Sequence, residues 1–490
     1  MKIEWTLHEV RNAVAQGESS AVDICRTCLD RIKARDEKLH AFTTVSSERA
    51  LSCAEQIDRT RTIDTDARPL LGVPIAIKDN ICTRDITTTA SSRILENFIP
   101  PYDATVITKL KRAGAVLLGK TNCDEFAMGS STEHSAFGVT RNPWALDRIP
   151  GGSSGGSAVA VAARMVPAAL GSDTGGSVRQ PAALSGITGL KPTYGRVSRF
   201  GLLAFASSLD QIGPLTCTVR DAAILLNVIA GPDSYDSTIS LQDVPDFTKA
   251  LTGDIRGARI GVPRKILNKG VDEDVNRAFF EALGVLDARG ATLVDIELPH
   301  ADSAIPVYSL IAAAEASSNL ARYDGVRYAY RASLSENETT IATMYNQTRN
   351  RGFGSEVKRR IMLGTYALSA GYHDAYYLKA QQVRTLIRRD YELAFNKVDV
   401  VATPTTPLAA FRLGTHVNDP LQMYLIDVFT VSANLTGLPA LSVPCGFTSA
   451  KLPTGLQLTG RPFDEATPLR LADAYERDEP WWKELPPDLK

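Results

Sequence analysis

Long apolar runs and an excess of charge of either sign are both missing from this sequence. No stretch of side chains reaches the ~18 apolar residues that a bilayer-spanning helix needs. The start, from Met1 to Trp5, lacks the charged-then-apolar order of a secretion signal. The 54 Lys and Arg residues are balanced by 55 Asp and Glu residues, so the formal net charge is −1. These absences argue against a membrane protein and against a surface that wraps nucleic acid, and they predict a cytoplasmic location.

Cysteines are few, and their spacing follows no disulfide framework. The seven cysteines are an odd number and lie scattered along the chain, which is typical of reduced thiols. Cys25 and Cys28 form a Cys-x-x-Cys pair, but it lacks the second pair or nearby histidine that a zinc site uses. We therefore favour a helix face with two separate thiols over a redox or zinc role, and we expect no metal in this chain.

Helical and strand-like segments alternate along the 490 residues. Helices are predicted at 7–60, 105–113, 157–164, 221–229, 272–287 and 378–396, and strands at 71–77, 115–118, 166–170, 259–262, 291–298, 398–402, 441–443 and 456–458. This order predicts one α/β domain over residues 1–490, a mixed β-sheet flanked by helices on both faces, with residues 1–60 packed on it as a helical segment. The polar segments 233–255 and 330–352 are predicted to be irregular insertions or surface loops.

Two glycine-rich segments carry most of the chemical information. The first reads Gly-Gly-Ser-Ser-Gly-Gly-Ser from Gly151 to Ser157, and the second reads Gly-Ser-Asp-Thr-Gly-Gly-Ser from Gly171 to Ser177. Glycine clusters where the backbone bends tightly or approaches a ligand. Backbone N–H groups and serine hydroxyls in such loops suit acyl transfer, which needs an oxygen nucleophile and donors for the oxyanion.

Three kinds of site compete for these glycine-rich segments. Gly151, Ser153 and Gly155 match Gly-x-Ser-x-Gly, the nucleophile elbow of Ser-His-Asp hydrolases, but Ile149-Pro150 precede them where a buried strand should end. A phosphate-binding loop is a second candidate, although GxxxxGK[ST] and GxGxxG do not occur. The third candidate is a serine nucleophile with a lysine base.

Lys78 is the candidate base, because it follows directly on an apolar strand. Burial lowers the pKa of a lysine, and a neutral amine then accepts a proton. The alternative is that Lys78 pairs with Asp79 or another carboxylate and stays charged. The sequence pattern does not decide between these two states.

The two serine segments, together with Val-Pro-Ile-Ala-Ile-Lys-Asp at 73–79, resemble the amidase signature family. The 75-residue gap from Lys78 to Ser153 also matches that family's pattern. Within the family the chain is similar to the A subunits of the glutamyl-tRNA(Gln)/aspartyl-tRNA(Asn) amidotransferases. Further matching segments are Gly189–Ser198, Ala206–Pro214, Glu315–Leu320, Arg359–Gly364 and Met423–Thr430.

The resemblance implies a Ser-Ser-Lys mechanism. Ser177 is implied as the nucleophile, Ser153 as a proton relay that follows a cis peptide bond, and Lys78 as the neutral base. The backbone N–H groups of Thr174, Gly175, Gly176 and Ser177 are implied as the oxyanion hole, where one donor typically contributes ~3 kcal/mol.

The resemblance also implies glutamine as the substrate. Arg360 matches the position that binds the α-carboxylate, Asp427 the position for the α-ammonium, and Tyr308 a contact to the side chain. The ordinary alternatives are that Arg360 caps a helix, that the adjacent Arg359 takes its place, and that Asp427 is an N-cap.

The same resemblance implies a heterotrimer with B and C subunits. The B subunit would use ATP and Mg²⁺ to activate misacylated tRNA, and this chain would supply ammonia and hold no cofactor itself. A free-standing amidase acting on other small amides is the alternative function, and an assembly subunit without activity is a third.

Overall fold

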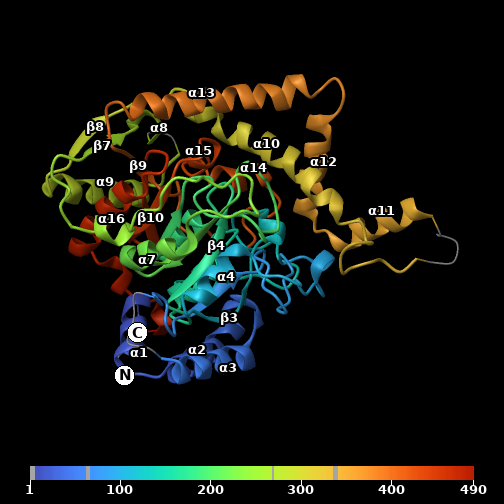
Figure 1. Ribbon diagram of the computed structural model, residues 1–490. Helices are drawn as coiled ribbons and strands as arrows, with labels where there is room; N and C mark the ends of the chain where they lie inside the picture. Colours follow the sequence, from blue (N-terminus) through green and yellow to red (C-terminus); the bar gives the residue numbers. More distant parts are fainter. Residues whose placement is uncertain (1–5, 62–66, 268–269, 335–339, 490) are drawn as a thin grey trace.

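A single eleven-stranded mixed β-sheet organises the chain in the computed structural model, which describes residues 6–61, 67–267, 270–334 and 340–489 (Figure 1). The strand order is β1-β3-β2-β4-β6-β5-β10-β11-β9-β7-β8. The strands are β1 Phe42–Val45, β2 Pro74–Lys78, β3 Val116–Thr121, β4 Ala168–Asp173, β5 Thr188–Lys191, β6 Gln211–Thr216, β7 Arg259–Val262, β8 Thr292–Asp295, β9 Val400–Pro404, β10 Ala440–Phe447 and β11 Pro453–Thr459.

Helices cover both faces of this sheet, as the sequence predicts. The helices are α1 Leu7–Gln16, α2 Ala21–Leu39, α3 Ser47–Arg59, α4 Thr105–Arg112, α5 Gly155–Ala162, α6 Arg179–Ser185, α7 Val219–Ile229, α8 Arg264–Leu267, α9 Glu273–Ala288, α10 Ala304–Asn319, α11 Ile341–Gly352, α12 Ser355–Leu368, α13 Lys379–Ala394, α14 Pro420–Leu425, α15 Val431–Leu435 and α16 Ala466–Asp478. Helices α5 and α6 pack on the central strands, and α7, α9 and α16 form a second packed group. None of the helices in the described residues has the length and apolar character to cross a membrane.

Parallel and antiparallel pairing divide the sheet into distinct parts. β2 pairs in parallel with both β3 and β4, and β7 pairs in parallel with β8 and β9. Between them β6, β5, β10 and β11 are paired antiparallel. The carboxyl ends of β2 and β4 therefore emerge side by side, which is where parallel sheets commonly place a site.

Two of the predictions for local structure are wrong. Residues 42–45, predicted as helical, form β1, because this β-branched stretch pairs antiparallel with β3 through Phe42↔Thr121. Within 330–352, predicted as irregular, residues 341–352 form α11, whose first turn is capped by the Thr340 side chain accepting from the Thr343 N–H. Few residues of α11 are buried, so its sequence shows no clear helical spacing of apolar residues. Residues 335–339, and residues 1–5 at the chain start, lie outside the described part.

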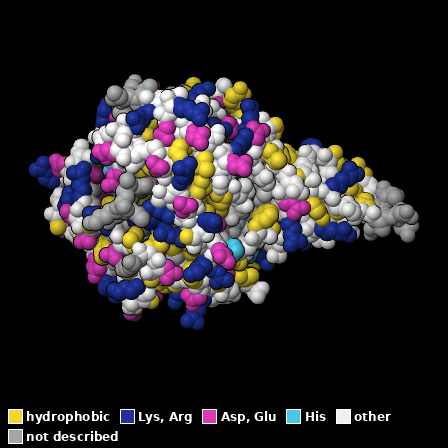
Figure 2. Space-filling model, turned by 90° about the horizontal axis from the view of Figure 1, so that it is seen from below, with side chains coloured by type: hydrophobic (Ala, Val, Ile, Leu, Met, Phe, Trp, Pro, Cys, Tyr) yellow, Lys and Arg dark blue, Asp and Glu magenta, His cyan; other side chains and the backbone are white. Residues whose placement is uncertain are grey.

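Positive and negative side chains are mixed on the surface, as expected from their nearly equal numbers in the sequence. Figure 2 shows Lys and Arg side chains interspersed with Asp and Glu over the face seen from below. Helix α11 extends away from the body, α12 packs against α10, and α13 runs along the upper edge of the molecule (Figure 1). The segment from α10 to α13 thus forms a separate layer over the sheet, held by contacts of α10 with α12, α13 and α15.

Candidate active site

Lys78 lies at the end of β2, beside the end of β4. The parallel register pairs Ile75 with Ala168 and Ile77 with Leu170. This register continues to Lys78 beside Gly171, and the lysine amine contacts the next residue, Ser172, near the end of β4. The strand pairing, more than any local motif, brings the lysine to the glycine loops.

The Lys78 amine is fully buried among hydroxyl and carbonyl oxygens. Its Nζ lies 2.7 Å from Ser153 Oγ, 2.9 Å from Ser154 Oγ, 2.9 Å from Ser172 Oγ and 3.2 Å from the Ser172 carbonyl oxygen. Burial lowers the pKa of Lys78 to about 8, against the opposing pull of nearby acidic groups. A minor but much increased fraction of neutral amine is therefore present near neutral pH, in hydrogen-bond contact with a serine.

The alternative pairing of Lys78 with Asp79 is not what the structure contains. Asp79 accepts hydrogen bonds from the backbone N–H and hydroxyl of Thr89. Burial raises the pKa of Asp79, and Lys120 is the cation that opposes this rise. Among the described ion pairs none involves Lys78. The lysine thus has hydroxyl partners in place of a counter-ion.

The first serine loop is held by contacts that only glycine permits. The Gly152–Ser153 peptide bond is cis, as the resemblance implies. A Cβ atom at Gly152 would overlap Asp124 Oδ2 and would lie 2.7 Å from the Ser131 backbone nitrogen. The Gly152 N–H donates to Gln180 Oε1 at 2.8 Å, and the Asp124 N–H donates to the Ser153 carbonyl at 3.2 Å. These contacts fix Ser153 against Lys78.

Asp173 and Arg179 organise the second serine loop. Asp173 accepts from the N–H groups of Gly176 and Val178 at 2.9 and 3.1 Å, and Arg179 binds it through Nε and Nη2 at 3.1 and 3.0 Å. Burial alone would raise the pKa of Asp173, but the charge and hydrogen bonds of Arg179 lower it to about 2. The loop therefore bends around a permanently ionised carboxylate.

Ser177 lies at the end of this loop and is 7% exposed. Its carbonyl accepts from the Ser154 N–H at 3.2 Å, so the two serine loops are joined directly. Its hydroxyl makes no hydrogen bond to Ser153 or to any other group among the described residues. The N–H of Gly176 is committed to Asp173, so the oxyanion role stays a prediction that Thr174, Gly175 and Ser177 carry.

Arg360 and Tyr308 line one small crevice next to the second loop. The ring of Tyr308 covers Gly175, where a Cβ atom would lie 2.7 Å from Tyr308 Cζ. Arg360 donates through Nε to Glu356 at 2.7 Å and lies over the rings of Phe205 and Tyr424. The ion pair with Glu356 uses Nε, so the Nη groups lie outside it, beside Tyr424, and can form a fork for a carboxylate.

The alternatives for this cation do not apply. Arg360 lies in the interior of α12 and does not cap it. The side chain of Arg359 is 44% exposed, whereas that of Arg360 is 9% exposed. The crevice itself has about 10 Å³ of free volume, so a molecule of amino-acid size enters only when the lining side chains move.

Asp427 offers a buried carboxylate with one free oxygen. Its Oδ2 accepts from the Ser130 hydroxyl at 2.5 Å, while Oδ1 has no partner in the described chain. Burial raises the pKa of Asp427 to about 7. It is not an N-cap, because Thr430 holds that position in α15. An unpaired buried acceptor of this kind is costly unless a donor from a ligand satisfies it.

Several residues of the site were not predicted. Ser154 and Ser172 complete the shell around the Lys78 amine, and Glu356, Tyr424 and Ser130 hold the outer groups. Ser154 and Ser172 stand inside the two glycine-rich segments, so their position was a usable signal. Glu356 lies four residues before Arg360, and Tyr424 lies three residues before Asp427, so both are near predicted residues; Ser130 is remote from all of them.

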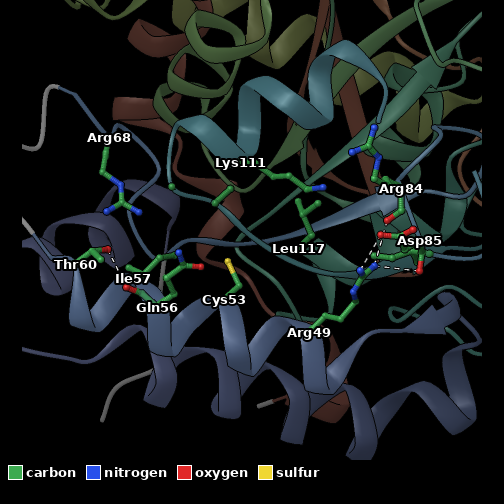
Figure 3. A pocket seen from close by; sticks show the side chains of 13 residues that line it. Arg49, Cys53, Gln56, Ile57, Thr60, Arg68, Arg84, Asp85, Lys111 and Leu117 are labelled. Atoms are coloured by element: carbon green, nitrogen blue, oxygen red, sulfur yellow. Dashed lines mark hydrogen bonds and ion pairs between the residues drawn. The ribbon is translucent and has the colours of Figure 1, made fainter. Parts of the chain in front are cut away.

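A larger open cavity lies elsewhere. It measures about 430 Å³ and opens between α3 and α4, where Figure 3 shows Cys53 and the charged side chains around it. Arg49 bonds to Asp85 at 3.1 Å, and Lys111 pairs with Asp103 at 2.6 Å. None of the residues predicted for the site lines this cavity.

Comparison with known proteins finds amidases and A subunits of amidotransferases. The family model described as Amidase matches residues 23–469. The A subunit of glutamyl-tRNA(Gln) amidotransferase from Chloroflexus aggregans is 58% identical over 98% of both chains. The crystal structure of the A subunit of glutamyl-tRNA(Gln) amidotransferase from Thermotoga maritima is 46% identical with a TM-score of 0.80, covering 97% of this chain and 95% of that one. Peptide amidase from Stenotrophomonas maltophilia is 32% identical with a TM-score of 0.79, covering 97% of both chains.

Proposed function

This chain belongs to the amidase family, and from that premise we infer that it is the glutamine-hydrolysing subunit of a glutamyl-tRNA(Gln) amidotransferase. The 58% identity to the Chloroflexus aggregans amidotransferase chain, over nearly the whole length, supports this narrower assignment. The sequence identity to the peptide amidase is lower, at 32%. The observation that carries the chemistry is the buried Lys78 amine 2.7 Å from Ser153 Oγ.

In the acylation step Ser177 Oγ attacks the side-chain carbonyl carbon of glutamine. Its proton passes to Ser153, which gives its own proton to the neutral Lys78 amine. The N–H groups of Thr174, Gly175 and Ser177 would bind the developing oxyanion. Collapse of the tetrahedral intermediate breaks the C–N bond, and the proton returns through Ser153 so that ammonia leaves. A γ-glutamyl ester on Ser177 remains.

Water completes the cycle by the same relay. Lys78, through Ser153, takes a proton from water as its oxygen attacks the ester carbon. The C–O bond to Ser177 then breaks, the serine regains its proton, and glutamate leaves. The same groups serve both directions of the relay: Lys78 and Ser153 share a hydrogen bond of 2.7 Å, and Ser177 would join them when its hydroxyl turns toward Ser153.

Charge complementarity supports glutamine as the amide. The Nη fork of Arg360 fits the α-carboxylate, and Oδ1 of Asp427 fits the α-ammonium. Tyr308 would contact the aliphatic part of the side chain beside Gly175. Ser130 and Glu356 then act as supports that aim these two charged groups.

We propose that the ammonia is used in a complex. A B subunit would activate misacylated tRNA with ATP and Mg²⁺, and a small C subunit would join the two. A formal net charge of −1 for this chain agrees with tRNA being held mainly by a partner. No cofactor is then required in this chain.

Substrate preference separates this function from a free-standing amidase. The complex, co-expressed and co-purified, is assayed for ammonia release from glutamine and from aliphatic and aryl amides that lack the α-charges. We expect a strong preference for glutamine. Efficient turnover of the apolar amides by the isolated chain would contradict the subunit function.

Ser177→Ala tests the nucleophile. The variant should lose glutamine hydrolysis while it still co-purifies with the partner subunits, because the hydroxyl makes no hydrogen bond within the described residues that would support the fold. A variant that hydrolyses glutamine at a near-normal rate would exclude Ser177 as the nucleophile, and one that no longer assembles would show a structural role instead.

A further inference from the structure

The segment from Asp124 to Thr132 contacts both the first serine loop and Asp427. Asp124 contacts the first serine loop through its N–H, Ser130 donates to Asp427, and the Thr132 hydroxyl donates to the Gly151 carbonyl. One residue of the segment, Glu125, points in a different direction, toward the start of α12.

Glu125 is buried and anchors the first residue before α12. Its Oε2 accepts from the Gly354 N–H at 2.8 Å, and its Oε1 accepts from the Ser92 hydroxyl. A Cβ atom at Gly354 would lie 2.5 Å from Glu125 Oε2, so a larger residue there would displace the Glu125 carboxyl group from this contact. The ring of Phe126 adds a second tie, since it packs against Phe353 at a centroid distance of 5.8 Å.

Helix α12 carries the cation that faces the crevice, between two anchors. Gly354 lies six residues before Arg360, about 9 Å along a helix axis. Four residues beyond Arg360, Gly364 packs on α10, where a Cβ atom would overlap the Ala313 carbonyl oxygen. Glu356, in the first turn, binds Arg360 Nε directly. The Glu125 contact therefore fixes the turn that orients the guanidinium.

We propose that Glu125 is a positioning residue that holds the first turn of α12 and thereby aims Arg360 at the α-carboxylate of the substrate. The proposal rests on glutamine hydrolysis as the function. It predicts that Glu125 determines selectivity for amides with an α-carboxylate and has no part in the Ser-Ser-Lys chemistry.

Both protonation states of Glu125 preserve the anchor. Burial raises the pKa of Glu125 to about 7. When the carboxyl is neutral, its O–H can donate to Ser92 Oγ, whose own hydroxyl then donates to the Gly352 carbonyl at 3.4 Å. A glutamine side chain reproduces this neutral arrangement, since its NH₂ donates to Ser92 and its oxygen accepts from Gly354. Glu125→Gln is therefore the matched control for Glu125→Ala.

The test compares glutamine with 4-aminobutanamide, which is glutamine without its α-carboxylate. In the co-purified complex, Glu125→Ala should raise KM for glutamine about tenfold or more, the loss typical of one hydrogen bond to a charged group, with little change in kcat. Activity on 4-aminobutanamide should not fall. Glu125→Gln should restore most of the affinity for glutamine, and Gly354→Ala should weaken it as Glu125→Ala does.

A double variant shows whether the effect passes through Arg360. Adding Glu125→Ala to Arg360→Ala should cause no further loss in kcat/KM for glutamine, because the group to be aimed is gone. An equal loss on both amides, or an unchanged KM for glutamine in Glu125→Ala, would overturn the proposal. Thermal unfolding of each variant identifies folding defects, and Gly354→Ala then provides a test that keeps the Glu125 side chain. If the unmodified complex did not hydrolyse glutamine at all, the proposed function would fail first, and separately.

Discussion

The burial of Lys78 leads to a quantitative prediction for the pH dependence of catalysis. The amine works as a base only when it is neutral, and burial lowers its pKa to about 8. With that pKa the neutral fraction is about 1% at pH 6, about 9% at pH 7, about half at pH 8 and about 90% at pH 9. The acylation rate should therefore rise about ninefold from pH 6 to pH 7 and about tenfold from pH 7 to pH 9.

The measurement must separate this titration from that of Asp427. In the proposed function Asp427 binds the α-ammonium, and burial raises its pKa to about 7, so kcat/KM is expected to contain the titrations of both groups. Single-turnover release of ammonia at saturating glutamine reports the acylation step alone, without product release. Lys78→Arg is the matched control, because a guanidinium keeps a positive charge but stays protonated at every pH in this range.

A flat acylation rate between pH 6 and pH 9 would refute the neutral-lysine mechanism, provided that the fold is intact over the range. Substantial activity in Lys78→Arg would refute it as well. A profile with its midpoint near pH 10.5, the ordinary value for lysine, would show that the lysine acts as a base but that burial does not tune it.

Three further substitutions test the surroundings of the site. Asp427→Asn should raise KM for glutamine with a smaller effect on kcat, measured by steady-state ammonia release, and an unchanged KM would remove Asp427 from ammonium binding. Gly152→Ala should destabilise the fold by about 1–3 kcal/mol in denaturant unfolding, because its Cβ would overlap Asp124 and backbone atoms; a neutral result would mean that the loop shifts freely. Asp173→Asn leaves Arg179 as a buried cation without its carboxylate and should lower the free energy of unfolding by about 3–5 kcal/mol. A decrease of less than ~1 kcal/mol would show that this ion pair does not anchor the loop.

The sequence predicted most of the parallel part of the sheet and both serine loops. The buried strands before Lys78 and before the second glycine segment are short apolar runs with clear ends. The helices between the strands have regular apolar spacing. The structure confirms β2, β3 and β4 near the predicted residues. The sequence pattern predicts helix at β1, because these four residues form a strand only by pairing with β3. That pairing partner is remote in the sequence, so the local pattern does not reveal it.

The outer part of the site was less accessible to such reasoning. Tyr308, Arg360 and Asp427 were located through a family resemblance, and nothing in the residues around them distinguished a ligand-facing group from a cap or an ordinary surface charge. The crevice residues come from α10, α12 and α14. Their convergence depends on the packing of three helices that are far apart in the chain.

The amino-acid sequence specifies the reactive groups: a lysine at the end of an apolar strand and two serine loops whose glycines admit close backbone contacts. The protonation state of the lysine depends on the tertiary structure. Parallel pairing of β2 with β4 buries the Lys78 amine among hydroxyls without a carboxylate partner, and burial is what lowers its pKa. A proton affinity depends on the groups that surround an atom in space, and those groups come from strands about 90 residues apart.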